Sequence, residues 1–249
     1  MIKDMLGNKQ KVYLDAMGID VWVRRDQSEQ TLMDASVPRV STLPAAEPVA
    51  ERSAPLDKSV PDDISSMDWA ALEAKVAACQ LCELHQTRTQ TVFGVGNRNA
   101  SLLIVGEAPG ADEDRQGEPF VGQAGQLLNA MLQAIQLARS DVYIANILKC
   151  HPPQNRDPAP EEAALCSPYL QRQIELMQPT LILALGRIAA QRLLQSDTSL
   201  AKLRGQTHRF APTNTPLVVT YHPAYLLRAP TEKAKAWQDL LYVKRLLEA

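Results

Sequence analysis

The stretch Ser101-Leu-Leu-Ile-Val-Gly-Glu-Ala-Pro-Gly110 decides the fold class, because an apolar run passes directly into a glycine-rich loop that carries an acid. A second segment has the same order: Pro216-Leu-Val-Val-Thr-Tyr221 passes into His222-Pro-Ala-Tyr-Leu-Leu-Arg228. Open parallel sheets bind ligands beyond the carboxyl ends of their strands, where such loops converge. We therefore expect the Glu107 carboxylate and the His222 imidazole to face one shared crevice, which is the layout of an enzyme.

From Met67 onward, strand-like and helix-like segments alternate. Runs rich in Val, Ile and Leu predict strands at 101–106, 142–148, 180–185 and 216–221. The spacing of apolar residues predicts helices at 68–78, 122–138, 160–177, 187–195 and 231–248. Strands that are apolar throughout are typical of a sheet covered on both faces. We predict an α/β protein with three layers, α/β/α, around a central, mostly parallel four-stranded sheet.

The N-terminal quarter of the chain differs in composition from the rest. Residues 1–33 contain one amphipathic segment, in which Tyr13, Leu14 and Met17 have helical spacing and Gly18 is a stop signal. Residues 34–66 are rich in Pro, Ala and Ser, a composition that buries too little apolar surface to order itself. We predict a short partner-binding helix in 1–33, a flexible linker over 34–66 and a folded domain over 67–249.

The overall composition is that of a globular protein, with 249 residues, 45% hydrophobic residues and a formal net charge of -2. A near-neutral total does not exclude nucleic acid as a partner, because binding needs a local basic patch and not a basic average. No apolar run is long enough to span a bilayer, and the N-terminus lacks the apolar region of a signal peptide. We expect no membrane association and a cytoplasmic location.

All four cysteines fall within 67–249. Cys79 and Cys82 form a Cys-x-x-Cys pair, Cys150 ends a predicted strand, and Cys166 lies on a predicted helix. In a reducing compartment such cysteines are more often ligands or buried thiols than disulfides. Four thiolates can hold zinc or an iron–sulfur cluster. Spacing alone leaves three alternatives open: zinc, iron–sulfur, and two core thiols beside a chance Cys-x-x-Cys.

The loop after the first predicted strand is not a nucleotide-phosphate loop. Its glycines fit neither the GxGxxG spacing nor the P-loop, and no Lys-Ser/Thr pair follows. Four carboxylates would also repel a diphosphate: Glu107, Asp112, Glu113 and Asp114.

Several motifs together resemble family 4 uracil-DNA glycosylase. They are GEAPGADEDRQGEPFVGQAGQLLN at 106–129, Asn146-Ile-Leu-Lys-Cys150, Pro152-Pro-Gln-Asn-Arg156 and HPAYLLR at 222–228. The motifs stand in the family's order and cover residues 68–248. The resemblance implies the uracil-DNA glycosylase fold and the excision of uracil from single- or double-stranded DNA. It also implies a [4Fe–4S] cluster, held by Cys79, Cys82, Cys150 and Cys166.

The resemblance further implies a role for individual residues. Glu107 and His222 would be catalytic: the carboxylate would hold or polarise the attacking water, and the imidazole would donate to uracil O2, where charge develops. Phe120 would stack on the flipped base, and Asn146 would read its pyrimidine edge. Further substrate contacts are expected from Gly106, Ala108, Glu113, Tyr225, Leu226 and Arg228. Of these, Tyr225 and Leu226, followed by Leu227, would form an apolar wedge into the duplex.

Basic residues in or near these loops are candidate phosphate contacts: Arg156, Arg187, Lys202, Arg204, Arg209 and Arg228. Among them we expect Arg204 and Arg228 to contribute most. No lysine stands in a motif suited to Schiff-base chemistry, so we expect a monofunctional glycosylase that leaves an abasic site uncut.

Residues 11–25 bear a weaker resemblance to the N-terminal peptide of the psi subunit of the replicative clamp loader. Trp22 with its flanking arginines would suit a groove on such a partner. We expect the protein to be a monomer. Two other functions stay open: a non-catalytic, replication-associated binding module with the same fold, and a zinc-supported nucleotide hydrolase.

Overall fold

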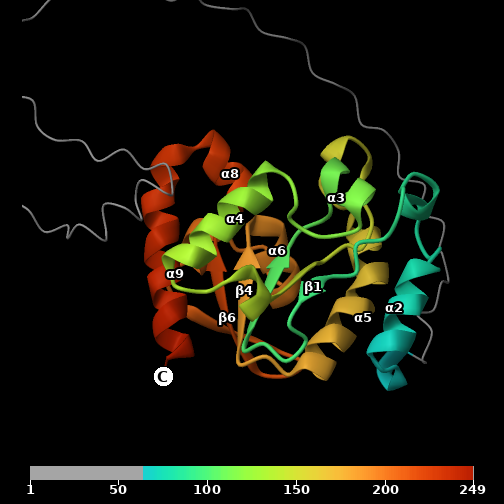
Figure 1. Ribbon diagram of the computed structural model, residues 1–249, viewed down its shortest axis with the longest axis horizontal. Helices are drawn as coiled ribbons and strands as arrows, with labels where there is room; N and C mark the ends of the chain where they lie inside the picture. The colour runs from blue at the N-terminus through green and yellow to red at the C-terminus, as the bar shows by residue number, and fades with distance from the viewer. Residues whose placement is uncertain (1–63, 249) are drawn as a thin grey trace, which may run out of the picture.

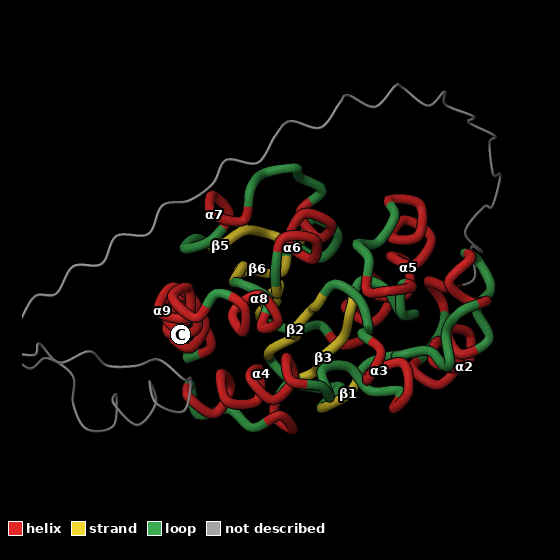
Figure 2. The backbone as a smooth tube through the Cα atoms, turned by 90° about the horizontal axis from the view of Figure 1, so that it is seen from above, coloured by secondary structure: helices red, strands yellow, loops and turns green. Residues whose placement is uncertain are grey.

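A computed structural model of the protein describes residues 64–248. Within this range a central sheet lies between two layers of helices, which confirms the predicted α/β/α arrangement (Figure 1, Figure 2). The predicted helix in 1–33 and the predicted linker up to residue 63 lie outside the described residues. The last three linker residues form a 3-10 helix, η1 (Ile64–Ser66), whose Ile64 is buried in the core.

The sheet has six strands within the described range, in the order β1-β3-β2-β4-β6-β5. The four predicted strands are its parallel centre: β2 (Leu102–Gly106), β3 (Tyr143–Asn146), β4 (Leu181–Leu185) and β6 (Thr215–Thr220). Two strands that the sequence does not predict, β1 (Val95–Gly96) and β5 (Thr207–Phe210), pair antiparallel at the two edges. The sheet is therefore wider than the four strands expected.

Strand β2 shows why both faces of the sheet are covered. Successive side chains of a strand point to opposite faces. Leu103 and Val105 belong to one apolar cluster, while Leu102 and Ile104 belong to the other. All five residues of β2 are buried. An apolar run without alternation thus corresponds to a strand with a helix layer on each side.

The helices divide between these two faces, as Figure 2 shows. One layer contains α2 (Trp69–Ala77), α5 (Pro160–Met177), α6 (Arg187–Leu194) and α7 (Leu200–Leu203). The other contains α4 (Gln123–Ala134), α8 (Pro223–Arg228) and α9 (Lys233–Leu247). The short helix α3 (Ala111–Gln116) lies in the loop after β2. Four further 3-10 turns are η2 (Glu83–Gln86), η3 (Arg139–Asp141), η4 (Pro153–Asn155) and η5 (Pro230–Glu232).

Local sequence signals account for the starts of α2 and α5. Asp68 caps α2 by accepting a hydrogen bond from the Ala71 amide at 2.8 Å. Helix α5 begins at Pro160, where the missing amide hydrogen costs nothing. Helix α4 ends at Ala134, four residues before its predicted end, and Gln136 has a left-handed φ of 66°. No helix among residues 64–248 is long and apolar enough to cross a membrane.

The carboxyl ends of the four parallel strands lie at the same edge of the sheet. Gly106 at the end of β2 pairs in register with Asn146 at the end of β3. On the other side, Leu185 at the end of β4 pairs with Thr220 at the end of β6. The loops that carry Glu107 and His222 therefore start from neighbouring parts of one sheet edge.

Candidate active site

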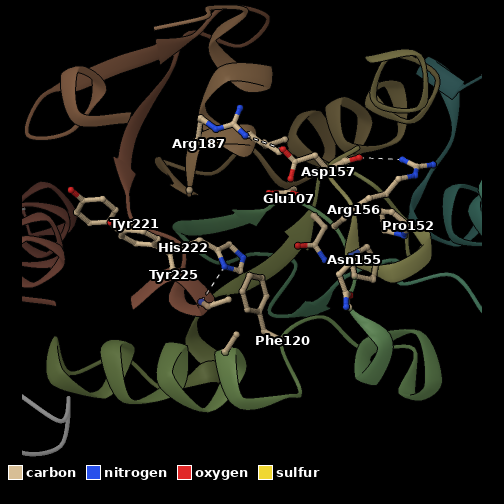
Figure 3. A pocket seen from close by; sticks show the side chains of 18 of the residues that line it. Glu107, Phe120, Pro152, Asn155, Arg156, Asp157, Arg187, Tyr221, His222 and Tyr225 are labelled. Atoms are coloured by element: carbon tan, nitrogen blue, oxygen red, sulfur yellow. Dashed lines mark hydrogen bonds and ion pairs between the residues drawn. The ribbon is translucent and has the colours of Figure 1, made fainter. Parts of the chain in front are cut away.

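A pocket of about 760 Å³ opens beyond these strand ends. Its wall includes both Glu107 and His222, so the structure brings the predicted acid and imidazole together (Figure 3). Six of the other residues expected to contact substrate also line it: Ala108, Glu113, Phe120, Asn146, Tyr225 and Arg228. Such a crevice at the carboxyl edge of a parallel sheet is where the fold class places its ligands.

Glu107 is half-buried at the end of β2. Burial raises the pKa of Glu107 to about 7; the nearby Asp157 carboxylate also raises it, and the Arg187 guanidinium lowers it. Arg187 Nη2 donates to Asp157 Oδ2 at 2.9 Å, and Figure 3 shows this pair beside Glu107. At neutral pH the Glu107 carboxyl group is thus poised between its two protonation states, which suits a group that accepts a proton during a reaction.

His222 is the N-cap of α8 and is followed by Pro223 at the first helical position. The Ala224 amide donates to His222 Nδ1 at 3.2 Å. Burial, helped by the Arg228 charge, lowers the pKa of His222 to about 4, so the imidazole is neutral at physiological pH. Because Nδ1 accepts a hydrogen bond, the single ring proton of the neutral form resides on Nε2. The helix cap thus leaves Nε2–H as the donor of the ring.

The side chains of Phe120 and Asn146 both lie close to the backbone of Gly106. A Cβ atom on Gly106 would be 2.4 Å from Asn146 Oδ1 and 2.7 Å from Phe120 Cζ, so only glycine allows this close approach. Gly106 adjoins two residues of the pocket wall without itself lining the pocket, and its predicted contact with substrate stays a prediction. The Phe120 ring also lies beside the His222 ring, with centroids 5.5 Å apart.

The Asn146 side chain is buried, and its Oδ1 has no hydrogen-bond partner among the described residues. A buried amide oxygen without a partner costs free energy, on the order of 1–3 kcal/mol, unless a ligand or water supplies a donor. The Asn146 backbone, in contrast, is held in place, since the buried Lys149 ammonium donates to the Asn146 carbonyl at 3.1 Å. The amide is a fixed polar group in a pocket that otherwise leaves it unsatisfied.

Glu113 lines the pocket, but the backbone occupies its carboxylate. One oxygen accepts from the Gly110 amide at 3.0 Å, and the other accepts from the Val121 and Gly122 amides at 2.9 and 3.1 Å. Glu113 therefore ties the loop after β2 to the loop before α4. Glu113 thus organises the two loops, and its predicted contact with substrate stays a prediction.

Helix α8 presents its apolar residues in two directions. Tyr225 lines the pocket and is exposed, Leu227 is exposed, and Leu226 is completely buried among the apolar residues of the α4 and α9 layer. The prediction that Leu226 contacts substrate is therefore wrong, because helical geometry turns it into the core. Tyr225 stacks on Tyr221, with ring centroids 5.3 Å apart.

Comparison with known proteins agrees with this geometry. The family model for the uracil DNA glycosylase superfamily matches residues 93–241. A type-4 uracil-DNA glycosylase of Archaeoglobus fulgidus is 46% identical over 178 residues, which is 69% of this chain and 89% of the relative. The chain belongs to the type-4 uracil-DNA glycosylases. The enzymes of that name from Pyrobaculum aerophilum (42% over 180 residues, 70% of this chain and 92% of the relative) and Thermotoga maritima (43% over 155 residues, 62% and 80%) are similar to it as well.

The basic residues of this glycosylase are less free than the sequence suggests. Arg204, expected to be a main phosphate contact, is instead only partly exposed: it forms an ion pair with Asp239 at 2.7 Å and lies over the Tyr221 ring. Arg156 pairs with Glu162 at 2.6 Å, and Arg187 pairs with Asp157. Arg228 is exposed at the pocket. Lys202 and Arg209 are exposed but do not line it.

The four cysteines of the glycosylase converge, although they come from three segments of the chain. All four line one small space between α2 and α5, next to Lys149. Arg88 Nη1 donates to Cys150 Sγ at 3.1 Å, and the Lys149 amide donates to Cys166 Sγ at 3.3 Å. Burial raises the pKa of Cys166 to about 12. Within 64–248 no three His, Cys, Asp or Glu side chains are arranged to hold one metal ion.

Two residues of the glycosylase site have no counterpart in the sequence-based prediction. Asp157 faces Glu107, and its signal was its place directly after the Pro152–Arg156 motif. Lys149 joins the thiol-lined space to Asn146. It lies inside the Asn146–Cys150 motif, but the motif does not predict this role, because its partners Phe93 and Gln173 come from distant segments.

Proposed function

We propose that the pocket takes a uracil flipped out of DNA and that the enzyme hydrolyses the bond between the base and deoxyribose, leaving an abasic site for base excision repair. One observation carries the assignment of the substrate: the buried, unpartnered oxygen of Asn146. Uracil presents an N3–H donor beside its O4 acceptor, which is the edge that an amide with a free oxygen and a free NH₂ group complements. Cytosine offers an acceptor at N3 and a donor at C4, so both contacts would be mismatched.

In this mechanism the bond between C1′ of the sugar and N1 of uracil breaks, and the bonding electron pair leaves with the base. Nε2–H of His222 donates to uracil O2, where negative charge collects. The neutral ring suits this task, because an imidazolium would transfer its proton to the base.

The sugar develops positive charge as the base leaves, and water then adds at C1′. Ionised Glu107 offsets that charge and accepts a proton from the attacking water. Phe120 provides a flat apolar surface for the base. Flipping costs a few kcal/mol, less for a mispaired uracil, which favours deaminated cytosine opposite guanine.

The pocket supports hydrolysis without strand cleavage. No lysine lines it within the described range. The buried Lys149 donates to the Phe93 carbonyl, the Asn146 carbonyl and Gln173 Oε1, so its nitrogen is not directed at a substrate. A Schiff-base route therefore lacks its nucleophile.

We also propose that the four thiols hold a [4Fe–4S] cluster. A set of four cysteines fits this group, and the Arg88 and Lys149 donors next to the sulfur atoms suit thiolates. The cluster would cross-link the segment after α2, the loop after β3 and helix α5. Each chemical step above uses only protein side chains.

Three expectations concern the whole chain and stay predictions: a monomer, a cytoplasmic location, and binding of residues 11–25 to the replicative clamp loader. The last is tested by capture of purified clamp loader on the full chain and on a chain without residues 1–33. Equal capture by both would refute it.

The decisive experiment measures free uracil released from single-stranded and U·G duplex oligonucleotides. We expect release from the intact protein and heat- or alkali-labile abasic sites in the product. Asn146→Ala should slow release by about a hundredfold or more, since two buried contacts to the base are lost. Asn99→Ala, an exposed position outside the pocket, is the matched control. DNA binding without uracil release by the intact protein would instead support a non-catalytic binding module.

A further inference from the structure

Phe120 has an unusual backbone conformation. Its φ is 55°, in the left-handed region, which is disfavoured for a residue with a bulky side chain. A conformation of this kind persists only when the surrounding structure holds it in place. The ring of the same residue forms part of the pocket wall, so whatever holds the Phe120 backbone also sets the position of that ring.

Arg139 holds this backbone from a distant part of the chain. It lies in η3, just before β3, and does not line the pocket. Its Nη2 donates to the Pro119 carbonyl at 2.5 Å, and its Nη1 donates to the Phe120 carbonyl at 3.3 Å. A further contact of Nη1, to Asn129 Oδ1 on α4 at 3.4 Å, orients the guanidinium. One planar group thus contacts two consecutive carbonyls, which a lysine ammonium cannot match in geometry.

Two other features complete the support of the loop. Glu113 accepts from the Val121 and Gly122 amides, so the segment is held by its carbonyls on one side and by its amides on the other. Gly125 makes room for the Phe120 carbonyl, because a Cβ atom there would lie 1.9 Å from that oxygen. Of the three supporting residues, Glu113 and Gly125 belong to the segment 106–134, and Arg139 reaches the loop from outside it.

We propose that Arg139 is a positioning residue for uracil excision: it fixes the backbone at Phe120, so that the ring presents its face to the base at the correct depth. It acts through Phe120 and does not touch the substrate. The inference rests on the proposed function, and uracil release by the intact protein tests that function separately.

The test is a double-mutant cycle on the full-length holoenzyme. Arg139→Met should lower kcat/KM for uracil release by about tenfold or more, since small displacements of a positioning group are costly. In a Phe120→Ala background the same change should have an effect of less than about twofold, because the group through which Arg139 acts is already gone. Arg98→Met is the matched control: Arg98 is half-buried like Arg139 and pairs with Glu73, but it has no contact with the Phe120 backbone and lies outside the pocket.

A purely structural role for Arg139 would lower thermal stability and reduce release by the same factor in both backgrounds, and that result would overturn the proposal. Release by Arg139→Met equal to that of the intact protein would overturn it too. If Arg139→Met does not fold, Arg139→Lys keeps the test open, since one donor should give an intermediate rate. Methylguanidinium should restore part of the rate to Arg139→Ala and none to Phe120→Ala. A failure to rescue the folded Arg139→Ala variant would count against the proposal.

Discussion

Replacing Glu107 by glutamine tests the assignment of this carboxylate in two independent ways, through the pH dependence of catalysis and through the pH dependence of folding. Burial and the Asp157 charge raise the pKa of Glu107 from 4.5 to about 7. The reaction requires the ionised form, so single-turnover release should rise about tenfold per pH unit below pH 7 and level off above it. His222 contributes no ionisation in that range, because its pKa is lowered to about 4.

The folding prediction follows from the same pKa shift. Between pH 4.5 and 7 the folded protein keeps a proton on Glu107 that the unfolded chain loses, so the contribution of this group to stability falls as pH rises through this window and is constant above it. A pKa unit corresponds to about 1.4 kcal/mol, and partial exposure of the carboxyl group reduces the full penalty to about 2 kcal/mol. Glu107→Gln should therefore raise the melting temperature at pH 8 by about 4–8 °C, and by less at pH 5.5.

The assay pairs single-turnover uracil release with thermal unfolding of the holoenzyme from pH 5.5 to 8.5. Glu107→Gln should release uracil more slowly by about a hundredfold or more. It should also lose the acid limb, which is the rise of the rate with pH below pH 7. Two neighbouring variants provide internal controls with opposite signs. Asp157→Asn should move the acid limb to lower pH, and Arg187→Met should move it to higher pH, because they remove the charges that raise and lower the pKa of Glu107. An acid limb that persists in Glu107→Gln, or that moves in the same direction in both controls, would refute the reasoning.

Three further predictions concern other parts of the molecule. His222→Ala should slow uracil release by about 10²–10³-fold and leave the acid limb in place, since the lost donor acts on the leaving base; a loss of the limb instead would reassign it to His222. Cys166→Ser should lose visible absorbance and bound iron, while Ser167→Ala on the same helix keeps both; iron retained in Cys166→Ser would contradict the proposed ligand set. Leu226→Ala should destabilise the fold by about 2–5 kcal/mol and Leu227→Ala by about 0.5 kcal/mol or less, as measured by unfolding; equal losses would contradict the burial of Leu226.

The central strands could be predicted because their signal is local. Each is an apolar run that continues into a polar loop, and burial on both faces leaves no competing interpretation. The edge strands have no such signal. Strand β1 is two residues long, and β5 is largely exposed, so its residues carry no apolar pattern. Their pairing depends on the neighbours that folding provides.

The same distinction separates the correct and incorrect site predictions. Glu107 and His222 each follow a strand directly, so topology alone brings them to one edge of the sheet. Leu226 and Arg204 do not lie where the sequence predicts, and the reasons are tertiary. The rotation of α8 places Leu226 in the core, and Asp239, 35 positions further along the chain, takes up the Arg204 charge. Sequence spacing contains neither fact.

The bare backbone at Gly106 has an evolutionary consequence. Even one added carbon at this position would collide with both the aromatic ring and the amide that lie above it. A descendant of this protein that accepts a bulkier or differently functionalised base therefore has to change other side chains of the pocket, since no larger residue fits at Gly106. Substitutions at the end of β2 are therefore not tolerated, and new base specificities have to arise in the loops around it.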